Sequence, residues 1–336
     1  MIFCFGELLL RMSPALGREW IQQRQMPVYI GGAELNVATA LANWQVPVRY
    51  MTALPDHYLS REILDELREK NIDTSTTHFS GNRVGLYYLP QGTDLKSAGV
   101  IYDRAHSSFS ELKPGMIDWD AALDGCTWFH FSAISPALNE QVALVCQEGL
   151  EAARKKGMTI SVDLNYRAKL WQYGKQPPGV MLRLLDYCQV VMGNIWAAEQ
   201  LLGFSSSIAD SKGKSKEELV EAAGKSMLQI HHTFPGVMTM AYTFRLDETY
   251  FAVLQHGPVM VASREFSLED IKDRAGSGDC FMAGLIYGLH NNHAHGEIID
   301  FAAAAAVGKM QEAGDASNQD IDTVKNIMTR EWTATK

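Results

Sequence analysis

The sequence has no excess of positive charge. Among its 336 residues, 30 are Lys or Arg and 39 are Asp or Glu, which gives a formal net charge of −9. Such a chain lacks the broad basic surface that binds nucleic-acid backbones without regard to base sequence. We therefore expect no nucleic-acid partner.

Cysteine is scarce and unpatterned. The chain has 5 cysteines, namely Cys4, Cys126, Cys146, Cys188 and Cys280. They are odd in number and far apart, and none forms a CxxC pair, so neither a disulfide framework nor a zinc site is expected. Reduced thiols of this kind are typical of a cytoplasmic location.

Long hydrophobic runs are absent too. The first apolar run carries Glu7 and has no basic lead or cleavage site, so it is predicted to be a strand and not a targeting segment. The run at 301–307 is mostly alanine and far shorter than the roughly 20 residues that span a bilayer. With 46% hydrophobic residues, the chain is expected to be soluble, without a membrane partner, and to bury a large core.

From about residue 120 onward, two kinds of segment alternate. Short apolar segments rich in β-branched and aromatic residues predict buried strands at 126–132, 158–163, 189–194 and 237–243. Between them, 139–156 has a helical apolar face, and Ser215 with Glu218 forms a capping box. This order predicts an α/β fold: a doubly wound, mostly parallel sheet flanked by helices.

Two stretches break this alternation. Residues 11–30 and 83–104 mix aromatic and polar residues with Gly and Pro, which is typical of antiparallel ribbons. Neither can form its own core, so we expect them to make a small β-sheet lid over an α/β catalytic domain built from 1–10, 31–82 and 105–336. Their exposed edges favour a homodimer formed through the lid.

The segment DRAGSGD at 273–279 is the strongest chemical signal. A glycine-rich turn leads into an apolar helix, where free backbone N–H groups create a positive pocket for phosphate oxygens. Asp279 lies in the first turn, beside any bound anion. An ordinary capped helix gives the same local pattern, so the motif needs support elsewhere.

Two further segments give that support. In GGAELNVA (31–38), paired glycines precede a helix, and Asn36 can both donate to and accept from sugar hydroxyls, although it could equally be a structural amide. DLNYRAKLW (163–171) follows a predicted strand, at the sheet edge where open parallel sheets bind ligands.

In the order and spacing of these motifs, the chain resembles the ribokinase-like (PfkB) sugar kinases over nearly its whole length. GGAELNVA resembles the early sugar-binding signature of that family and DRAGSGD its late catalytic signature. VIYDRAHSSFS (100–110) together with DLNYRAKLW resembles the branch that phosphorylates 2-keto-3-deoxygluconate. The resemblance implies a sheet flanked by helices with a β-sheet lid, and ATP and Mg²⁺ as cofactors.

The resemblance also implies roles for individual residues. Asp279 would take the proton from the sugar hydroxyl that attacks the γ-phosphate, and the N–H groups of Gly276, Ser277, Gly278 and Asp279 would stabilise the transferring group. Asp273 resembles a position that acts indirectly on the metal, although an Asx turn explains it equally well. The nucleotide-binding residues implied are Asn194, Gly276, Gly278 and Asn318.

The substrate-binding residues implied are Gly31, Gly32, Asn36, Tyr87, Tyr102, Arg104, Asn165 and Arg167. The two arginines carry the choice of sugar, because a guanidinium can hold a carboxylate that neutral hexoses lack. Tyr87 and Tyr102 would cover the sugar from the lid, or would simply pack within it.

The chain departs from the family at three places. After QVVMGN the family commonly has Asn-x-x-Glu, whereas this chain has Asn194 followed by Ala197. Glu199 lies two residues further on, roughly 200° around a helix, and cannot simply substitute. FRLDETY replaces a glycine-rich turn, and Arg274 stands where threonine is common.

Three alternatives remain open at this stage. A dehydrogenase is disfavoured because no GxGxxG turn follows the first strand. A non-catalytic sugar- or nucleotide-binding protein on the same scaffold is suggested by Ala197. Within the enzyme class, fructokinase or another sugar kinase of the same type is the runner-up.

Overall fold

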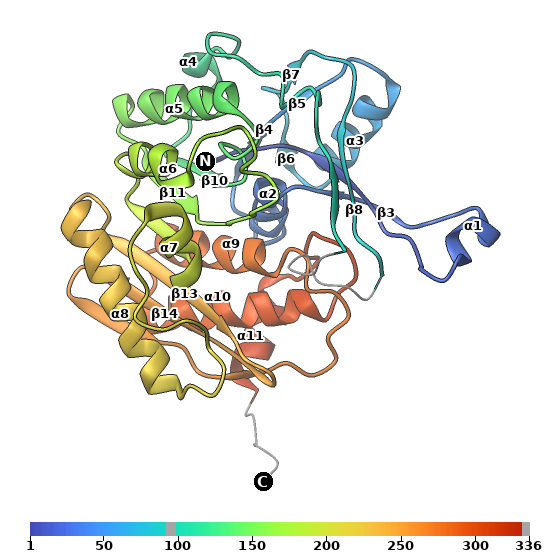
Figure 1. Ribbon diagram of the computed structural model, residues 1–336. Coiled ribbons are helices and arrows are strands. Elements are labelled where there is room, and N and C mark those ends of the chain that lie inside the picture. The colour runs from blue at the N-terminus through green and yellow to red at the C-terminus, as the bar shows by residue number, and fades with distance from the viewer. Residues whose placement is uncertain (92–98, 331–336) are drawn as a thin grey trace.

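The computed structural model describes residues 1–91 and 99–330, and its largest element is a ten-stranded sheet (Figure 1). The strand order is β15-β14-β13-β12-β11-β10-β1-β4-β6, with β16 also paired to β14. The strands are β1 (Ile2–Phe5), β4 (Val48–Met51), β6 (Ile72–Asp73), β10 (Trp128–Ser132), β11 (Thr159–Asp163), β12 (Val190–Gly193), β13 (Thr239–Arg245), β14 (Thr249–His256), β15 (Val259–Ala262) and β16 (Phe266–Ser267). From β6 to β13 all neighbours are parallel, and β14 is antiparallel to its neighbours.

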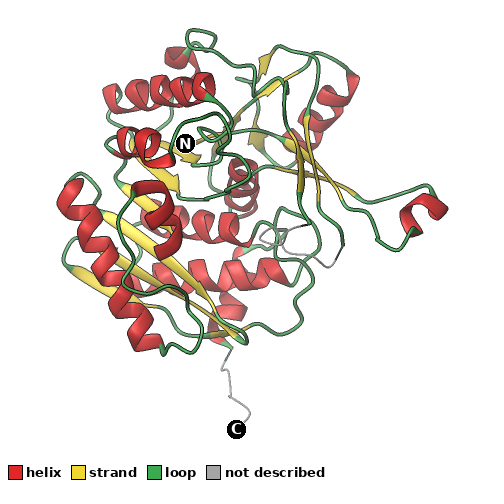
Figure 2. Ribbon diagram, viewed as in Figure 1, coloured by secondary structure: helices red, strands yellow, loops and turns green. Residues whose placement is uncertain are grey.

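Helices cover both faces of this sheet (Figure 2). One face packs against α4 (Trp119–Ala122), α5 (Glu140–Lys155), α6 (Pro177–Leu185), α7 (Ile195–Leu202) and α8 (Lys216–Thr233). The other packs against α2 (Ala33–Asn43), α3 (Tyr58–Glu69), α9 (Ser277–His290), α10 (His295–Met310) and α11 (Ile321–Thr329). Two hydrophobic cores result, one on each side, as expected for a doubly wound sheet.

The local signals in the sequence explain these elements. The four predicted strands correspond to β10 to β13, and every residue of β10 and β12 is buried because helices cover both faces. Asn139 caps α5 by accepting from the Val142 N–H at 2.9 Å. The capping box of Ser215 and Glu218 opens α8 as predicted. The α/β fold expected from the sequence is confirmed.

A second, four-stranded sheet stands beside the first, in the order β3-β2-β8-β9 (Figure 1). Its strands are β2 (Leu9–Met12), β3 (Val28–Gly31), β8 (Gly85–Tyr88) and β9 (Ile101–Asp103). Each ribbon is antiparallel, but the two ribbons meet through a parallel pairing of β2 with β8. The short helix α1 (Glu19–Gln23) forms the far tip of the first ribbon, where the sequence analysis expected only strand. The part of the second ribbon at 92–98 lies outside the described residues.

Three smaller observations complete the fold. A two-stranded pair, β5 (Ala53–Leu54) and β7 (His78–Phe79), lies next to the edge of the main sheet. All five cysteines are free thiols. Among the described helices, none has the length and hydropathy needed to cross a bilayer.

Candidate active site

A cavity of about 750 Å³ lies between the second sheet and the carboxyl ends of β11, β12 and β13. The residues predicted to act in chemistry or binding that line it are Gly32, Asn36, Tyr87, Tyr102, Arg104, Asn165, Arg167, Asn194, Gly276, Ser277, Gly278 and Asp279. Segments from five separate parts of the sequence therefore meet at one place. Three predicted residues, Gly31, Asp273 and Asn318, do not line it.

Asp279 occupies the first turn of α9 and is 7% exposed. Its Oδ2 accepts a hydrogen bond of 2.7 Å from Asn36 Nδ2 on α2. Burial raises the pKa of Asp279 to about 7, although the Asn36 hydrogen bond and the nearby Arg167 charge act in the opposite direction. A carboxyl group with its pKa close to neutral is suited to general base catalysis.

The turn before α9 is built to receive an anion. Gly276 has a φ of 76°, and a Cβ atom there would overlap the carbonyl oxygen of Asp315. Only glycine fits this position. No side chain caps α9, and within the described residues the N–H groups of Gly278 and Asp279 have no protein acceptor. These amides, at the positive end of the α9 dipole, face the cavity.

Asn36 has one unused polar atom beside Asp279. Its Oδ1 is buried and has no hydrogen-bond partner among the described residues. Such an acceptor normally pairs with a ligand or a water molecule, because leaving it unpaired is costly. Gly32, at the start of α2, has a φ of 135°, and a Cβ atom there would overlap the Glu7 carbonyl oxygen. Gly31, outside the cavity, leaves room for the carboxylate of Asp315.

A charged cluster follows β11. Asp163 is 5% exposed, and its carboxylate has no hydrogen-bond donor within the described residues. Burial first, and then the charge of Asp279, raise the pKa of Asp163 well above its ordinary value, while Arg167 opposes the shift. Arg167 is half-buried and donates from Nη1 to the Tyr166 carbonyl at 3.0 Å. Its positive charge lowers the pKa of both Asp163 and Asp279.

Arg104 is less available than the sequence analysis expected. It is 5% exposed, and both its Nε and its Nη2 lie 2.6 Å from Glu7 Oε2. Glu7 Oε1 also accepts from the Ser107 hydroxyl.

The two predicted tyrosines differ in their hydrogen bonds. The Tyr87 hydroxyl donates to Asp315 Oδ2, whereas the Tyr102 hydroxyl has no such partner among the described residues.

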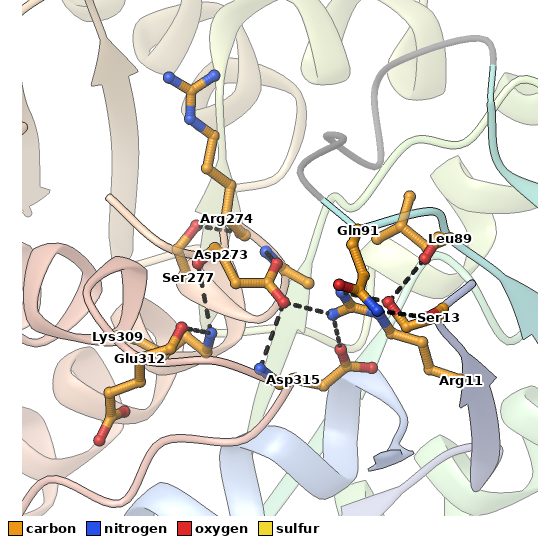
Figure 3. Close-up of polar contacts among 12 residues, drawn as sticks. Arg11, Ser13, Leu89, Gln91, Asp273, Arg274, Ser277, Lys309, Glu312 and Asp315 are labelled. Atoms are coloured by element: carbon orange, nitrogen blue, oxygen red, sulfur yellow. Dashed lines mark hydrogen bonds and ion pairs between the residues drawn. The ribbon is translucent and has the colours of Figure 1, made fainter. Parts of the chain in front are cut away.

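The two residues expected to act on the metal and at the nucleotide lie elsewhere. The Asp273 carboxylate accepts from Arg11 and from the N–H groups of Ala275 and Gly314, so its geometry favours the loop-anchoring role that the sequence left open (Figure 3). Asn318 is exposed, and its N–H donates to Glu312. Asn194 does line the cavity, while its Oδ1 caps α7 by accepting from Ala197 N–H at 2.8 Å.

Sequence reasoning missed four residues of this region, namely Glu7, Arg11, Glu34 and Asp315. Glu34 is 1% exposed, and its Oε1 accepts hydrogen bonds from the backbone N–H and the hydroxyl of Ser132. Glu7 and Glu34 each stand as a charge within an apolar segment, which is the signal that could have marked them. No local pattern marks Arg11 or Asp315.

The arrangement defines a class of chemistry. A buried carboxylate with a near-neutral pKa adjoins a set of free amides at a helix N-terminus, and an unpaired amide oxygen lies next to both. Such a site can deprotonate a hydroxyl group while it stabilises a phosphoryl group that the hydroxyl attacks. The fold and the site together define a phosphotransferase that acts on an alcohol.

Comparison with known proteins agrees with this class. The family of pfkB carbohydrate kinases matches residues 1–322. The crystal structure of 2-dehydro-3-deoxygluconokinase from Thermotoga maritima is similar, with a TM-score of 0.88, 32% identity, and coverage of 98% of this chain and 99% of the other. A 2-dehydro-3-deoxygalactonokinase from Haloferax volcanii is 27% identical over 326 residues, covering 96% of this chain and 95% of the relative. A 2-dehydro-3-deoxygluconokinase from Escherichia coli (strain K12) is 24% identical over 269 residues, covering 76% and 79%.

The chain belongs to the pfkB family of carbohydrate kinases. Its fold is ribokinase-like, with a mostly parallel central sheet flanked by helices and a small second sheet. The membership predicted from GGAELNVA and DRAGSGD is confirmed, and the dehydrogenase alternative is excluded by it.

Proposed function

We propose that this kinase transfers the γ-phosphoryl group of ATP to the terminal hydroxyl of 2-keto-3-deoxygluconate, also called 2-dehydro-3-deoxygluconate. The observation that carries the proposal is the set of cavity residues around Asp279: a base and free amides at one end, and Arg167 beside them. The names of the relatives from Thermotoga maritima and Escherichia coli support the same sugar acid.

In this proposal, the polar groups of the cavity have distinct roles in catalysis and binding. Asp279 removes the proton of the attacking hydroxyl, while Asn36 holds the base through Nδ2 and accepts from the sugar through Oδ1. The N–H groups of Gly278 and Asp279 bind the oxygens of the transferring phosphoryl group. The second sheet covers the cavity and keeps water from the base, which limits wasteful ATP hydrolysis.

The residues fit a magnesium ion that is held mainly by the nucleotide. Within residues 1–91 and 99–330, no three His, Cys, Asp or Glu side chains are grouped to hold a metal on their own. Mg²⁺ at nucleotide sites typically uses one or two carboxylates, with phosphates and waters completing its shell. Asp163, which is buried and has no hydrogen-bond donor in the described part of the chain, suits that task better than Asp273, which pairs with Arg11. When bound, the ion neutralises charge on the nucleotide phosphates.

Arg167 supports a sugar acid over a neutral sugar. Its guanidinium lines the cavity and, across residues 1–91 and 99–330, forms no ion pair with a buried carboxylate like the one that Arg104 forms with Glu7. A substrate carboxylate would add a charge-assisted, two-point contact with Arg167. Arg104, paired with Glu7, would form the neighbouring part of the cavity wall, and Tyr102 would cover the sugar.

An ATP-coupled assay across a panel of sugars tests the proposal. The panel contains 2-keto-3-deoxygluconate, its C4 epimer 2-keto-3-deoxygalactonate, fructose, ribose and a nucleoside. The epimer is included because the Haloferax volcanii relative is a 2-dehydro-3-deoxygalactonokinase. We expect the highest kcat/KM with 2-keto-3-deoxygluconate. A preference for fructose or ribose would leave only the general sugar kinase, and saturable binding without turnover would favour a non-catalytic binding protein.

Ala197 predicts an unusual magnesium dependence. It lines the cavity at the position where the family commonly has an acid, and Glu199 points elsewhere, since its Oε1 accepts from the Ser206 N–H at 3.1 Å. We expect Ala197→Glu to lower the Mg²⁺ concentration at half-maximal activity several-fold, because it adds a carboxylate near the nucleotide phosphates. Ala197→Gln, of equal size but neutral, is the control. An unchanged Mg²⁺ titration for Ala197→Glu would refute the prediction.

We further propose that residues 11–30 and 83–104 act as a lid and that two copies of the chain pair through it. The outer strands β3 and β9 expose Val28 and Ile101, which are 52% and 63% exposed, and the tip of the first ribbon exposes Trp20 and Ile21. Apolar groups on open strand edges favour pairing with another chain.

Hydrogen exchange and light scattering check the lid and the dimer separately. Adding 2-keto-3-deoxygluconate and a non-hydrolysable ATP analogue should slow amide exchange in both lid segments, because closure buries their backbone. Exchange rates that stay the same in both segments would contradict closure. Light scattering should give twice the mass of the chain, and the mass of one chain would contradict the dimer.

A further inference from the structure

Arg11 on β2 joins the second sheet to the loop that leads into α9, where it contacts Asp273 (Figure 3). It is 3% exposed, and its Nη1 lies 2.7 Å from Asp273 Oδ2 and 2.6 Å from Asp315 Oδ1. Asp273 and Asp315 belong to two different loops, one before α9 and one after α10. One side chain of the second sheet therefore holds both.

Both aspartates contact the phosphate-binding turn, Asp273 through its carboxylate and Asp315 through its backbone carbonyl. Asp273 accepts from the Ala275 N–H at 3.0 Å and from the Gly314 N–H at 3.3 Å, so it fixes the turn and links it to the second loop. The carbonyl of Asp315 packs against Gly276 so closely that no Cβ would fit there. A shift of either aspartate would therefore move the turn that presents the amides next to Asp279.

The register of the second sheet aligns Arg11 with three aromatic residues. Tyr29, Arg11, Tyr87 and Tyr102 are direct cross-strand partners on β3, β2, β8 and β9. The Tyr29 ring lies under the Arg11 guanidinium at 5.1 Å and also contacts the position of Gly314. The Tyr87 hydroxyl donates to Asp315, and Tyr102 lines the cavity. One row of cross-strand side chains thus connects the cavity with the loops that hold the turn.

Lys309 holds the same turn from its other side. It is 0% exposed, and its Nζ lies 3.4 Å from the backbone carbonyls of Asp273 and Glu312. The ammonium group is fixed within α10 and the core, so it anchors the turn to the α/β body. Arg11, Tyr29 and Tyr87 contact this network from the second sheet, and of these three Arg11 pairs with both carboxylates.

We propose that Arg11 is a positioning residue for phosphoryl transfer: through Asp273 and Asp315 it sets the phosphate-binding turn according to the position of the second sheet. It touches neither the sugar nor the nucleotide in this arrangement, since it does not line the cavity. The inference rests on the proposed kinase reaction for its kinetic consequence, but its structural consequence can be measured without turnover.

The test compares Arg11→Ala with Arg49→Ala. Arg49 is a matched control because it also lies on a strand, in a 2.6 Å ion pair with Asp73, and does not line the cavity. For Arg11→Ala we expect faster amide hydrogen exchange in residues 273–280, a loss of kcat of at least tenfold, and a sugar KM within threefold of the wild type. Low millimolar guanidinium should restore part of kcat by filling the vacated site. Arg49→Ala should change none of these readouts.

Arg11→Lys keeps the positive charge and is the variant to measure if Arg11→Ala does not fold. It should lose less kcat than Arg11→Ala, because one ammonium can reach only part of the two-carboxylate contact. Exchange in 273–280 and kcat that both match the wild type, or equal losses in the Arg49 control, would overturn the inference. If the wild type phosphorylates no sugar, the proposed function fails, and the exchange data still decide the role of Arg11.

Discussion

Asp279→Asn is expected to lower kcat by roughly 10³-fold, while sugar and ATP binding change by less than a few-fold. Loss of a general base typically costs 10²- to 10⁴-fold in rate. Asn keeps the shape of the side chain and leaves the backbone amides of Gly278 and Asp279 in place. Steady-state kinetics and calorimetric binding of sugar and ATP analogue check both parts. Turnover close to the wild-type rate would exclude Asp279 as the base.

The wild-type pH profile follows from the same group. Because burial raises the pKa of Asp279 from an ordinary 3.8 to about 7, less than half of the base is ionised below neutral pH. We expect kcat to rise tenfold per pH unit below 7 and to level off above it. Asp73→Asn, on the far strand β6, is a control variant that should keep this profile.

The stability of the fold should fall as the pH rises, whereas kcat should increase. A carboxyl group with a raised pKa in the folded state stabilises the fold while it is protonated, and this contribution is lost as the pH rises through about 7. In the Asp279→Asn variant the side-chain amide remains neutral at every pH. The variant should therefore unfold at a higher temperature than the wild type above pH 7, by an amount equivalent to roughly 2–4 kcal/mol, and the difference should shrink toward pH 4. A difference that does not vary with pH would contradict the cause assigned to this pKa shift.

The sequence was informative where local chemistry decides the structure. Buried strands such as β12 and capped helices such as α5 and α8 carry their own signals, because strand periodicity and capping act within a few residues. The turn at 273–279 was equally readable, since glycine is required there by a positive φ and a close backbone contact at Gly276.

The polar pairs that complete the site were not predictable in this way. Arg104 and Glu7 are 97 residues apart, and Arg11 and Asp315 are 304 apart, yet each pair is in direct contact. Which carboxylate an arginine meets depends on how the second sheet docks on the main one, and no local pattern records that docking. The sequence alone therefore treated Arg104 as a free carboxylate ligand, whereas Glu7 holds it.

That pairing decides which arginine can test the choice of substrate. Removing Arg104 would leave Glu7 buried without its counter-charge, a change that commonly costs about 3–5 kcal/mol of stability. A loss of activity in such a variant would mix folding with recognition. Arg167 is half-buried and donates to a backbone carbonyl, and among the described residues it forms no direct ion pair like that of Arg104 with Glu7.

Arg167→Met is expected to raise the KM for 2-keto-3-deoxygluconate by tenfold to a hundredfold, with the KM for ATP within threefold of the wild type. The increase corresponds to roughly 1.4–2.7 kcal/mol, the size of a charge-assisted contact with a carboxylate. An exposed surface ion pair contributes only about 0–1 kcal/mol, so the two roles of an arginine differ in measured effect.

Two comparisons make this result specific to the sugar carboxylate. Arg183→Met, at an exposed position on α6, is the matched control and should leave both KM values unchanged. The reduced analogue in which the carboxylate is replaced by a hydroxymethyl group should bind weakly to the wild type and lose little more in Arg167→Met. Because Arg167 also lowers the pKa of Asp279, the variant should shift the kcat profile toward higher pH. Equal losses for the acid and its neutral analogue would mean that Arg167 supports the site without binding the carboxylate, and the sugar-acid assignment would then fail.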